Sequence, residues 1–443
     1  MKKKKNWISL ETLELEYVVY CYTLWFLEKN QNIYVGEDGM ANKIYLSLGS
    51  NLGNRFRNLR TAREKLRAFF TCNYSSLVIE TEALLPQYAP AAWNLPYLNA
   101  VLVGTSHLDP FSLLQGIKNL EKEMGRELDA PHWSPRIIDI DISAYGDLFI
   151  DTTKLCLPHR EIKNRIFLQY LLESLGYEIK EENRVKVNDF NAINYFAFDP
   201  KLVGIVNVTP DSFSDGGKYF GVDAAANRIE ELRRWGAYVI ELGAQSTRPN
   251  YVEISPLEEI SRLDRVFEKI KKSDDLGVDT YFDDVVQHIV SKYRVSWIND
   301  VRSHLKQNTI KLLADNNIKL VIMLYGTDLS WFMDRTKQLQ NLGIMRENIV
   351  IDPGIGFGKS RSENIAMIRN ISSLKEMGYE MMLAHSRKSF ISSFSNATVS
   401  ERDVETLSIS AFATEAGIDY LRVHNLEYHM KFFVAQAYAR RYQ

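Results

Sequence analysis

The sequence predicts a two-domain protein in which an α+β unit is followed by a (β/α)8 barrel. Its 443 residues are enough for two or three domains. Strands, helices and turns fill the first half, whereas short apolar strands alternate with helices over about 240 residues of the second half. The stretch VGIVNVTPDSFSDGGKYF, residues 203–220, separates the halves. It passes from an apolar strand straight into a polar, turn-rich loop, which is where α/β folds place their chemistry.

The composition is that of a globular protein. Hydrophobic residues make up 45% and charged residues 25%, and the net charge is −2. This balance argues against a general nucleic-acid binder, so we expect phosphate groups to be recognised by local arginines, lysines and loops. The three cysteines, Cys21, Cys72 and Cys156, lack C-x-x-C spacing. We therefore expect neither a disulfide framework nor a thiolate metal site, and we predict a cytoplasmic location.

Residues 1–42 are predicted to be an N-terminal extension of unknown role. Lys2–Lys5 and the later apolar run Tyr17–Leu27 suggest a signal peptide, but three glutamates intervene and no small-residue cleavage site follows. The apolar run is shorter than the roughly 20 residues that cross a bilayer, so no membrane partner is expected. A short amphipathic helix is the preferred interpretation, and Met40 offers an alternative start.

The first unit, residues 43–172, begins with a strand, a turn and a helix in succession. Ile44–Leu48 alternates like a strand, Gly49–Gly53 is turn-like, and Asn58–Phe70 has helical spacing. A further strand, Leu98–Gly104, and a further helix, Pro110–Met124, follow. This pattern predicts a compact α+β domain.

The chemistry of this unit centres on PHWSPRIIDID, residues 131–141. Residues two apart share one face of a strand, so Asp139 and Asp141 project together. Two such carboxylates can hold Mg²⁺, which often takes its other ligands from phosphate, although a lone D-x-D is more often a solvated strand face. Basic groups on both sides favour a triphosphate site. They are Arg126, His132, Arg136, Lys154, His159, Lys163 and Arg165.

This unit resembles the hydroxymethyldihydropterin pyrophosphokinases, which transfer pyrophosphate from ATP to a reduced pterin. The resemblance runs from about Lys43 to Phe167 and is carried by LGSNLG (48–53), PYLNA (96–100), WSPRIIDID (133–141), LPH (157–159) and NR (164–165). It implies a ferredoxin-like α+β fold, ATP and 6-hydroxymethyl-7,8-dihydropterin as substrates, and two magnesium ions.

The resemblance also implies roles for single residues. Arg136, Asp139 and Asp141 would be catalytic, with both aspartates as metal ligands. ATP-side contacts would come from Glu121, Arg126, His132, Trp133, Arg136, Lys154, His159 and Arg165, and pterin-side contacts from Thr81, Leu84, Tyr97, Asn99 and Phe167. His132, Cys156 and Arg160 depart from the family pattern. Leu85–Asn94 is predicted to be a mobile lid that excludes water.

Residues 173–200 are predicted to connect the two units. They mix charged residues with aromatic residues and contain no Gly/Ser-rich run, so a flexible tether is not expected. We predict a semi-ordered connector that packs against one or both units.

The second unit, residues 201–443, has the alternation of a (β/α)8 barrel. The predicted strands are Leu202–Val206, Tyr238–Leu242, Gly277–Asp279, Val295–Asn299, Ile318–Leu324, Ile349–Asp352, Glu380–Ala384 and Tyr420–Val423. Helices are predicted between them, among them Ala224–Trp235, Leu257–Lys271, Asn364–Met377 and Glu401–Ala416. The third strand is the most weakly patterned.

Polar residues recur where these strands end, and in a barrel this rim carries the chemistry. The set is Asn207, Ser246–Thr247–Arg248, Asp279, Asn299–Asp300, Asp352, Ser386–Arg387–Lys388, Arg422 and His424. Each alone could be a helix cap, but seven strand ends on one rim are hard to explain by capping. The candidate anion binders are Arg248, Lys388, Arg422 and His424, and the groups able to hydrogen-bond a flat heterocycle are Asp279, Asn299 and Asp352.

The second unit resembles the dihydropteroate synthases, which are TIM barrels. The shared motifs are NVTPDSFSDGG (207–217), STRP (246–249), DPGIGFGK (352–359), SRKS (386–389) and RVH (422–424). The resemblance implies that pyrophosphate leaves the pterin, that a methylene cation forms, and that the amine of p-aminobenzoate attacks it. Positive groups around the leaving pyrophosphate favour this reaction. A homodimer through the barrel helices is implied by the resemblance only.

The site residues implied by this second resemblance fall into three groups. The pterin would be held by Asp279, Asn299, Asp352 and Lys388, pyrophosphate by Asn207 with one magnesium ion, Arg422 and His424, and the aminobenzoate side would include Thr247, Arg248, Phe357 and Ser386. Lys388 and Arg422 would be catalytic, Thr247 would also border the pterin, and Thr209–Tyr219 would be a mobile loop. The departures from the family pattern are Glu241, Ala244, Gln245, Asn250, Met323–Gly326 and His385.

Together the resemblances predict a bifunctional enzyme for two consecutive steps of folate synthesis. A related pterin-binding methyltransferase is a second reading, but a methyl-transfer site needs no pyrophosphate pocket of the kind that Lys388, Arg422 and His424 would form. A non-catalytic pterin-binding protein is a third, and it predicts loss of Asp139, Asp141 or Lys388, all of which are present.

Overall fold

The computed structural model describes residues 42–127, 129–131, 133–185, 192, 194–208, 221–245, 253–270 and 275–439. These residues form two compact units: one comprises the residues up to Phe198 together with those from Lys431 onward, and the other comprises Asp199–Met430. The predicted extension, apart from residue 42, and the predicted mobile loop Thr209–Tyr219 lie outside the described residues. Each unit is described separately below.

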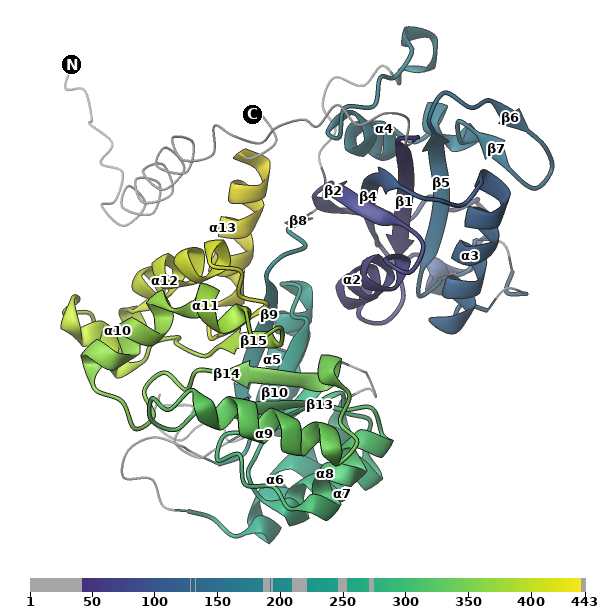
Figure 1. Ribbon diagram of the computed structural model, residues 1–443. Helices are drawn as coiled ribbons and strands as arrows, with labels where there is room; N and C mark the ends of the chain where they lie inside the picture. The colour runs from purple at the N-terminus through teal and green to yellow at the C-terminus, as the bar shows by residue number, and fades with distance from the viewer. Residues whose placement is uncertain are drawn as a thin grey trace, which may run out of the picture. The chain divides into compact units, whose positions relative to one another are not determined.

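The first unit is an α+β fold built on an antiparallel sheet, as predicted (Figure 1). The order of its strands is β5-β1-β4-β3-β8, with β2 also paired to β4. The strands are β1 Ile44–Ser50, β2 Thr71–Ser75, β3 Val78–Thr81, β4 Tyr97–Thr105, β5 Asp139–Tyr145 and β8 Tyr195–Phe196, and a small hairpin joins β6 Ile150–Asp151 to β7 Cys156–Leu157. The helices are α2 Arg55–Leu66, α3 Pro110–Glu123 and α4 Ile166–Glu173, with short 3-10 turns η1 Ala91–Trp93, η2 Arg160–Lys163 and η3 Glu181–Asn183.

Both faces of this sheet are buried. On one face Tyr45, Val101 and Val103 pack with Leu168 and Leu171 of α4. The side chains that alternate with them in β1, such as Ile44 and Leu46, are also buried, and α2 and α3 contact β1, β4 and β5. Helices on both faces explain why β4 is buried along nearly its whole length rather than at alternate residues.

Capping residues explain where the helices of this unit begin. The Asn54 side chain accepts a hydrogen bond from the Arg57 N–H, so α2 starts at Arg55, earlier than the predicted Asn58. Asp109 caps α3 in the same way, and Pro110 takes the first helical position as predicted.

The expected connector is partly a strand of the first unit. Its residues Tyr195–Phe196 form β8, which pairs antiparallel with β3. Phe196 and Phe198 lie with their ring centroids 5.4 Å and 6.3 Å from that of Phe56. The last part of the predicted connector is therefore an ordered edge of the sheet.

The second unit is a closed parallel barrel, which confirms the predicted (β/α)8 fold. Its described strands are β9 Lys201–Asn207, β10 Val239–Gly243, β11 Leu276–Asp279, β12 Trp297–Asp300, β13 Lys319–Met323, β14 Ile349–Asp352, β15 Glu380–Leu383 and β16 Tyr420–Val423. Its helices are α5 Val222–Arg234, α6 Pro256–Lys269, α7 Asp283–Lys292, α8 Gln307–Asp315, α9 Ser330–Asn341, α10 Arg361–Arg369, α11 Ile371–Lys375, α12 Asp403–Glu415 and α13 Leu426–Ala439, with 3-10 turns η4 Arg346–Asn348, η5 Ser389–Ser393 and η6 Val399–Glu401.

One predicted helix of the barrel was wrong in detail. The expected Asn364–Met377 is two helices, α10 and α11, which meet at Asn370 with φ −91° and ψ 9°. The Ser360 hydroxyl and the Glu363 carboxylate form a capping box, and so α10 begins at Arg361.

The barrel interior is layered along the strands. An apolar layer of Val203, Val239, Trp297 and Val350 fills the middle. Because alternate residues of a strand share a face, the next inward positions toward the strand ends are polar. They include Glu241, Asn299, Asp352 and Arg422. The barrel interior thus has a polar layer toward the carboxyl ends of the strands, next to the apolar layer.

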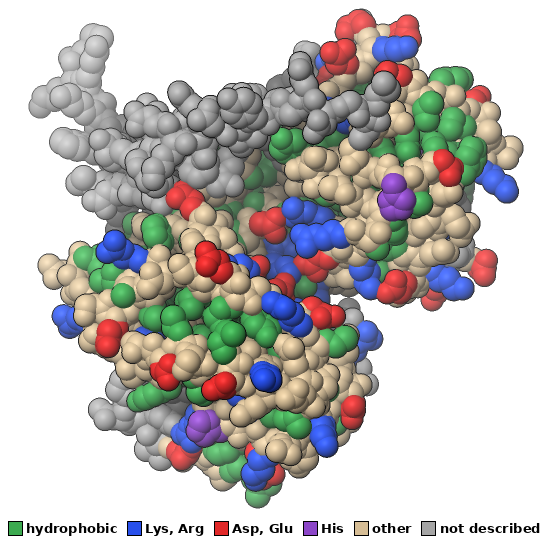
Figure 2. Space-filling model, in the orientation of Figure 1, with side chains coloured by type: hydrophobic (Ala, Val, Ile, Leu, Met, Phe, Trp, Pro, Cys, Tyr) green, Lys and Arg blue, Asp and Glu red, His purple; other side chains and the backbone are tan. Residues whose placement is uncertain are grey.

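On the face shown in Figure 2, acidic and basic side chains are interspersed on both units, in keeping with the net charge of −2. Within the described ranges, no helix combines the length and the apolarity needed to cross a bilayer.

Candidate active sites

The register of the first sheet brings the predicted metal and pterin residues onto one face. Gly49 of β1 lies opposite Asp139 on one side and opposite Asn99 on the other. Tyr97, two residues before Asn99, pairs with Thr81. Opposite partners in neighbouring strands share a face. Gly49, which has no side chain, is therefore flanked by the Asp139 carboxylate on one side and by the row of Asn99, Tyr97 and Thr81 on the other. A Cβ at Gly49 would lie 3.4 Å from the Asn99 Oδ1.

Asn51, in the predicted turn, holds two loops at the edge of this face. Its Oδ1 accepts a hydrogen bond from the Arg136 N–H at 2.8 Å, and its Nδ2 donates to the Leu95 carbonyl at 3.4 Å. It therefore fixes the loop that carries Trp133 and Arg136, and also the end of the predicted lid. Trp133 adopts a left-handed backbone conformation, with φ 72°, which few non-glycine residues do.

Asp139 is held by two arginines. Its carboxylate lies 2.5 Å from the Arg126 Nη1 and 3.1 Å from the Arg136 Nη1. Burial tends to raise the pKa of Asp139, but the charges of both arginines outweigh it and lower the pKa. Asp139 is therefore an anion at neutral pH.

Asp141, next to it on the same face, has the opposite electrostatic environment. Burial and the negative charge of Asp139 raise its pKa. Among the described residues, none donates a hydrogen bond to its carboxylate, although the charges of His159, Lys118 and Arg165 act on it. Two adjacent carboxylates, one of them without a donor, are a chemically suitable pair for hard cations. No cluster of three or more ligating side chains occurs in the described part of the chain.

Glu121 lies beneath this pair rather than at its surface. It is fully buried, and its carboxylate accepts from the Arg126 Nη1 at 2.6 Å and from the Ile140 N–H at 2.7 Å. Lys118, which the sequence analysis missed, lies 2.9 Å from its Oε2. With these partners and no exposure, Glu121 can act on the ATP side only through Arg126. Lys118 could have been found from its position one helical turn before Glu121.

The remaining predicted residues of the first site divide into two groups. The charges of Arg136, Asp139, Arg165 and Arg126 act on the Tyr97 hydroxyl, whose pKa burial raises, so these groups lie close together. Lys154 and Leu84 are exposed, and within the described part of the chain no polar contact joins Lys154 to the site. The His159 ring accepts from the Glu161 N–H at the start of η2, Phe167 packs at the edge of the core that α4 covers, and His132 lies outside the described residues.

In the second unit, predicted residues lie at the carboxyl ends of their strands. Asn207 ends β9, Asp279 ends β11, Asp300 ends β12 and Asp352 ends β14, while Arg422 is one residue from the end of β16. The parallel register sets Gly243 beside both Asn207 and Asp279, and Asp279 beside Asn299. The ends of β9, β10, β11 and β12 therefore lie side by side along this rim. Thr247 and Arg248 lie outside the described residues.

Arg422 is held between two carboxylates. Its Nη2 lies 2.7 Å from the Asp279 Oδ2, and its Nε donates to Glu241, which the sequence analysis had noted only as a departure. Burial works to lower the pKa of Arg422, but Glu241 and Asp279 outweigh it and raise the pKa. Burial raises the pKa of Asp279 to about 7, with Arg422 opposing that rise. Glu241 could have been found because it alternates with Gly243 on the inner face of β10.

Lys388 is a further predicted residue of this rim. Its ammonium donates to the Ile355 carbonyl at 2.6 Å and lies 4.6 Å from the centroid of the Phe357 ring. Burial lowers the pKa of Lys388 to about 8, although the charge of Asp352 opposes the shift. The Asp352 carboxylate accepts from the Gly354 N–H at 2.8 Å.

His424 and Ser386 are partners. The His424 Nδ1 lies 2.9 Å from the Ser386 Oγ, and the Ser386 Oγ also accepts from the His424 N–H. Burial and the nearby charges of Arg387 and Arg422 lower the pKa of His424 to about 3. This shift favours the neutral form of the His424 ring. Ser386, expected on the aminobenzoate side, is thus a hydrogen-bond partner of His424.

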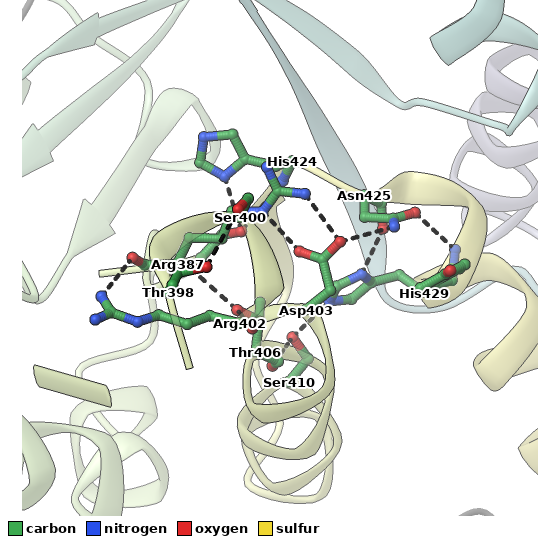
Figure 3. A network of polar contacts seen from close by, with 12 residues as sticks. Arg387, Thr398, Ser400, Arg402, Asp403, Thr406, Ser410, His424, Asn425 and His429 are labelled. Carbon is green, nitrogen blue, oxygen red and sulfur yellow. Dashed lines mark hydrogen bonds and ion pairs between the residues drawn. The ribbon is translucent and has the colours of Figure 1, made fainter. Parts of the chain in front are cut away.

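A network behind these residues holds two rim segments together (Figure 3). Arg387 lies in a left-handed conformation, with φ 59°, and donates two hydrogen bonds to Asp403 of α12, at 2.7 Å and 2.9 Å. Asp403 also accepts from the Asn425 Nδ2 at 2.9 Å. The segment that carries Ser386 and the segment that carries His424 are thus tied to one carboxylate. Asp403 was not predicted, because only the fold brings these segments together.

Family comparisons agree with both units. Residues 45–176 match the family model for 7,8-dihydro-6-hydroxymethylpterin-pyrophosphokinase, and residues 203–424 match the model for pterin binding enzymes. A dihydropteroate synthase from Clostridium difficile, solved with pteroic acid, is 30% identical, with a TM-score of 0.51 over 55% of this chain and 98% of that one. A Xanthomonas albilineans dihydropteroate synthase, solved with 4-aminobenzoic acid, is 28% identical, with a TM-score of 0.50 over 54% of this chain and 93% of that one.

One relative spans both units. A folate synthesis bifunctional protein from Chlamydia caviae is 33% identical over 441 residues, which cover 90% of this chain and 98% of the relative. Its likeness extends across the boundary that separates the two family matches. The chain therefore belongs to the family of bifunctional folate-synthesis enzymes, which join a 6-hydroxymethyl-7,8-dihydropterin pyrophosphokinase to a dihydropteroate synthase.

Proposed function

We propose that the carboxylate face of β5 carries out pyrophosphoryl transfer from ATP, and that the rim of the barrel condenses the product with p-aminobenzoate. The observation that supports this most is the sheet register, which puts Asp139 and Asp141 on the face that also carries Asn99 and Tyr97. A phosphate-handling carboxylate pair and a ring-binding row would then share one surface.

In the first site, Asp139 and Asp141 would hold two magnesium ions. When bound, magnesium neutralises the triphosphate and favours attack by the pterin hydroxyl. Arg126 and Arg136, which pair with Asp139 in the protein alone, would move their charges to phosphate oxygens. His159 and Arg165 would complete the ATP side, with Glu121 acting by orienting Arg126. His132, Trp133 and Lys154 remain proposed ATP contacts.

On the pterin side, Tyr97 and Phe167 would sandwich the ring, with Thr81 and Leu84 beside it. Asn99 donates its Nδ2 to the Thr81 hydroxyl at 2.8 Å, which leaves its Oδ1 as an acceptor. A carbonyl oxygen at this place suits the ring N–H and amino donors of a pterin.

In the barrel, Asp279, Asn299, Asp352 and Lys388 would hold the pterin ring. The Asn299 Oδ1 is buried and has no partner among the described residues, as expected of an acceptor that waits for a ligand donor. A buried acceptor of this kind is costly unless a ligand satisfies it.

The pyrophosphate would lie between Arg422, His424 and Asn207, with one magnesium ion held in part by the Asn207 carbonyl oxygen. His424 would donate an N–H as a neutral ring. Ser386, which contacts His424, would border this side as well as the aminobenzoate side. Arg422 and Lys388 would stabilise negative charge as the carbon–oxygen bond to pyrophosphate breaks.

The p-aminobenzoate would enter beside Phe357, with Thr247 and Arg248 on the same side. Phe357 lies against the Lys388 ammonium, so it borders the place where the methylene carbon would form. No nucleophilic side chain is required, because the amine attacks directly.

The test supplies purified protein with ATP, magnesium, 6-hydroxymethyl-7,8-dihydropterin and p-aminobenzoate, and measures AMP and dihydropteroate. Asp141→Ala should abolish AMP formation, while dihydropteroate still forms from pre-made pterin pyrophosphate. Asp151→Ala is the matched control, since that carboxylate is exposed and, within the described ranges, forms its ion pair with Arg160 alone. Loss of both activities in Asp141→Ala would contradict two separate sites.

We also propose a cytoplasmic location, supported by the cysteine usage, and a homodimer through the barrel helices, supported by the resemblance to dihydropteroate synthases. Sedimentation equilibrium of the purified chain tests the dimer.

A further inference from the structure

Glu241 is a buried carboxylate with three donors inside the barrel. It lies on the inner face of β10 and has no solvent exposure. Its oxygens accept from the Trp297 Nε1 at 3.1 Å, from the Asn299 Nδ2 at 3.3 Å and from the Arg422 Nε. A carboxylate oxygen can only accept, so each of these three neighbours must turn a donor toward it.

This requirement decides the orientation of the Asn299 amide. An amide has one donor end and one acceptor end, and the end that faces Glu241 has to be the NH₂ group. The reversed amide would set a carbonyl oxygen against a buried carboxylate, which is repulsive in a medium of low dielectric constant. The Asn299 Oδ1 must then point away from Glu241, and there it has no partner among the described residues.

We propose that Glu241 is a positioning residue for pterin recognition, which fixes the amide of Asn299 so that it presents an acceptor to the ring. The site then selects a heterocycle that offers an N–H or amino donor at this edge. Reduced pterins carry such donors on their ring nitrogens and on the exocyclic amine. This inference rests on the proposed assignment of Asn299 to the pterin ring.

The effect of Glu241 on the ring differs from its effect on Arg422. Glu241 also neutralises part of the charge of Arg422, so its loss should leave pyrophosphate binding unchanged or slightly tighter. Loss of a fixed acceptor should instead weaken binding of the ring. Loss of Glu241 is therefore expected to weaken binding of the ring but not binding of pyrophosphate.

The experiment uses the full chain, without ATP, and supplies pre-made pterin pyrophosphate and p-aminobenzoate. Because the pyrophosphokinase site does not contribute to this reaction, inhibition constants report the barrel alone. The probe for the ring is 6-hydroxymethyl-7,8-dihydropterin, and the probe for the leaving group is inorganic pyrophosphate. In Glu241→Gln, whose amide tolerates either orientation of Asn299, the inhibition constant of the ring should rise about tenfold or more. That of pyrophosphate should stay within about twofold of the wild-type value or fall.

Three further variants keep the test decisive. Trp297→Phe removes another donor to Glu241 without touching Asn299 and should leave the ring constant within about twofold of wild type. Glu241→Asp keeps the charge, and its inhibition constant for the ring should lie between those of wild type and Glu241→Gln. This variant also provides the test if Glu241→Gln folds poorly. Asn299→Ala tests the underlying assignment.

The outcomes are distinguishable. An unchanged ring constant in both Glu241→Gln and Glu241→Asp, or a loss confined to pyrophosphate, would overturn the role of Glu241. If Asn299→Ala weakens the ring and Glu241→Gln does not, only the positioning role fails. If Asn299→Ala leaves the ring constant unchanged, the proposed pterin assignment fails as well.

Discussion

Single residues in the barrel owe their charge states to the balance of burial against neighbouring charge. Lys388 and Arg422 are both basic and both buried, yet burial lowers the pKa of Lys388 to about 8, whereas Glu241 and Asp279 raise that of Arg422. Arg422 faces two carboxylates at bonding distance, while the ammonium of Lys388 is held by a carbonyl oxygen and an aromatic ring. Of the two, only Lys388 can change its charge near physiological pH.

The pH dependence of the synthase reaction should report this lysine. The Lys388 ammonium is present below its pKa of about 8 and is lost above it, so kcat/KM for pterin pyrophosphate should fall as pH rises through about 8. Lys388→Arg, which keeps a charge to much higher pH, should remove that falling limb even if the maximum activity is lower. A pH profile from pH 6 to about 10 measures both proteins. A limb that stays near pH 8 in Lys388→Arg would assign it to another group.

Asp403 is a residue whose effect should be confined to one activity. In Asp403→Asn the partly exposed ion pair with Arg387 is lost, which should cost about 1.5 to 3 kcal/mol in the stability of the barrel. The segments of Ser386 and His424 then lose their common anchor, so synthase kcat/KM should fall while AMP formation stays at the wild-type rate. Thermal unfolding and both assays measure this. Asp315→Asn, at the exposed end of α8, is the control, and an equal effect of the two variants would show that Asp403 has no special role.

At the scale of an element, the loop after β14 is held by one lysine. The Lys359 ammonium donates to the carbonyls of Leu324, Gly354 and Phe357 at 2.9, 3.0 and 3.1 Å. Gly354, with φ 66°, passes so close to the Leu324 carbonyl that a Cβ would lie 2.0 Å from its oxygen. The loops after β13 and β14 are therefore joined by a glycine and by a half-buried lysine of the same motif.

Removal of the Lys359 contacts should loosen the proposed aminobenzoate side of the site. Lys359→Met leaves the Leu324 carbonyl without its donor, and we expect a loss of about 1 to 3 kcal/mol in barrel stability. Because Phe357 moves with the loop, the KM for p-aminobenzoate should rise more than the KM for pterin pyrophosphate. Steady-state kinetics and thermal unfolding are the measurements, with Lys337→Met on the exposed side of α9 as the control. Equal increases in both KM values would argue against a loop-specific effect.

Across the whole molecule, local pattern predicted the elements, and long-range pairing explains what it missed. Short apolar runs such as Ile349–Asp352 and Tyr420–Val423 coincide with strands because a barrel strand is buried on both sides. No glycine or proline marks the break at Asn370, so the sequence pattern there predicts one continuous helix. Glu241 and Asp403 acquire their roles from partners that lie far away in sequence, such as Arg422 and Arg387. Without the fold, such contacts cannot be read from spacing.

The amino ends of the barrel strands carry a charged cluster whose role should be stability rather than catalysis. Glu380, at the start of β15, lies 3.1 Å from the Lys201 Nζ and pairs also with Lys319, and it accepts from the Tyr420 hydroxyl at 2.9 Å. Burial would raise the pKa of Glu380, but the two lysines outweigh it and lower the pKa to about 2. The folded state therefore favours the carboxylate form.

This cluster gives a stability prediction with a defined pH window. Because the folded pKa of Glu380 is about 2 and the ordinary value is 4.5, its contribution is fully present above pH 4.5 and is lost as pH falls toward 2. Glu380→Gln should thus destabilise the barrel by on the order of 2 kcal/mol at pH 7, and by progressively less in acid. Urea unfolding at several pH values measures the difference, and Glu376→Gln, exposed at the end of α11, is the control. On heating at pH 7, synthase activity should be lost at a lower temperature than in wild type, while pyrophosphokinase activity should be lost at the same temperature, because Glu380 belongs to the barrel alone. A destabilisation that does not change between pH 7 and pH 3 would show that the loss comes from packing and not from the charge.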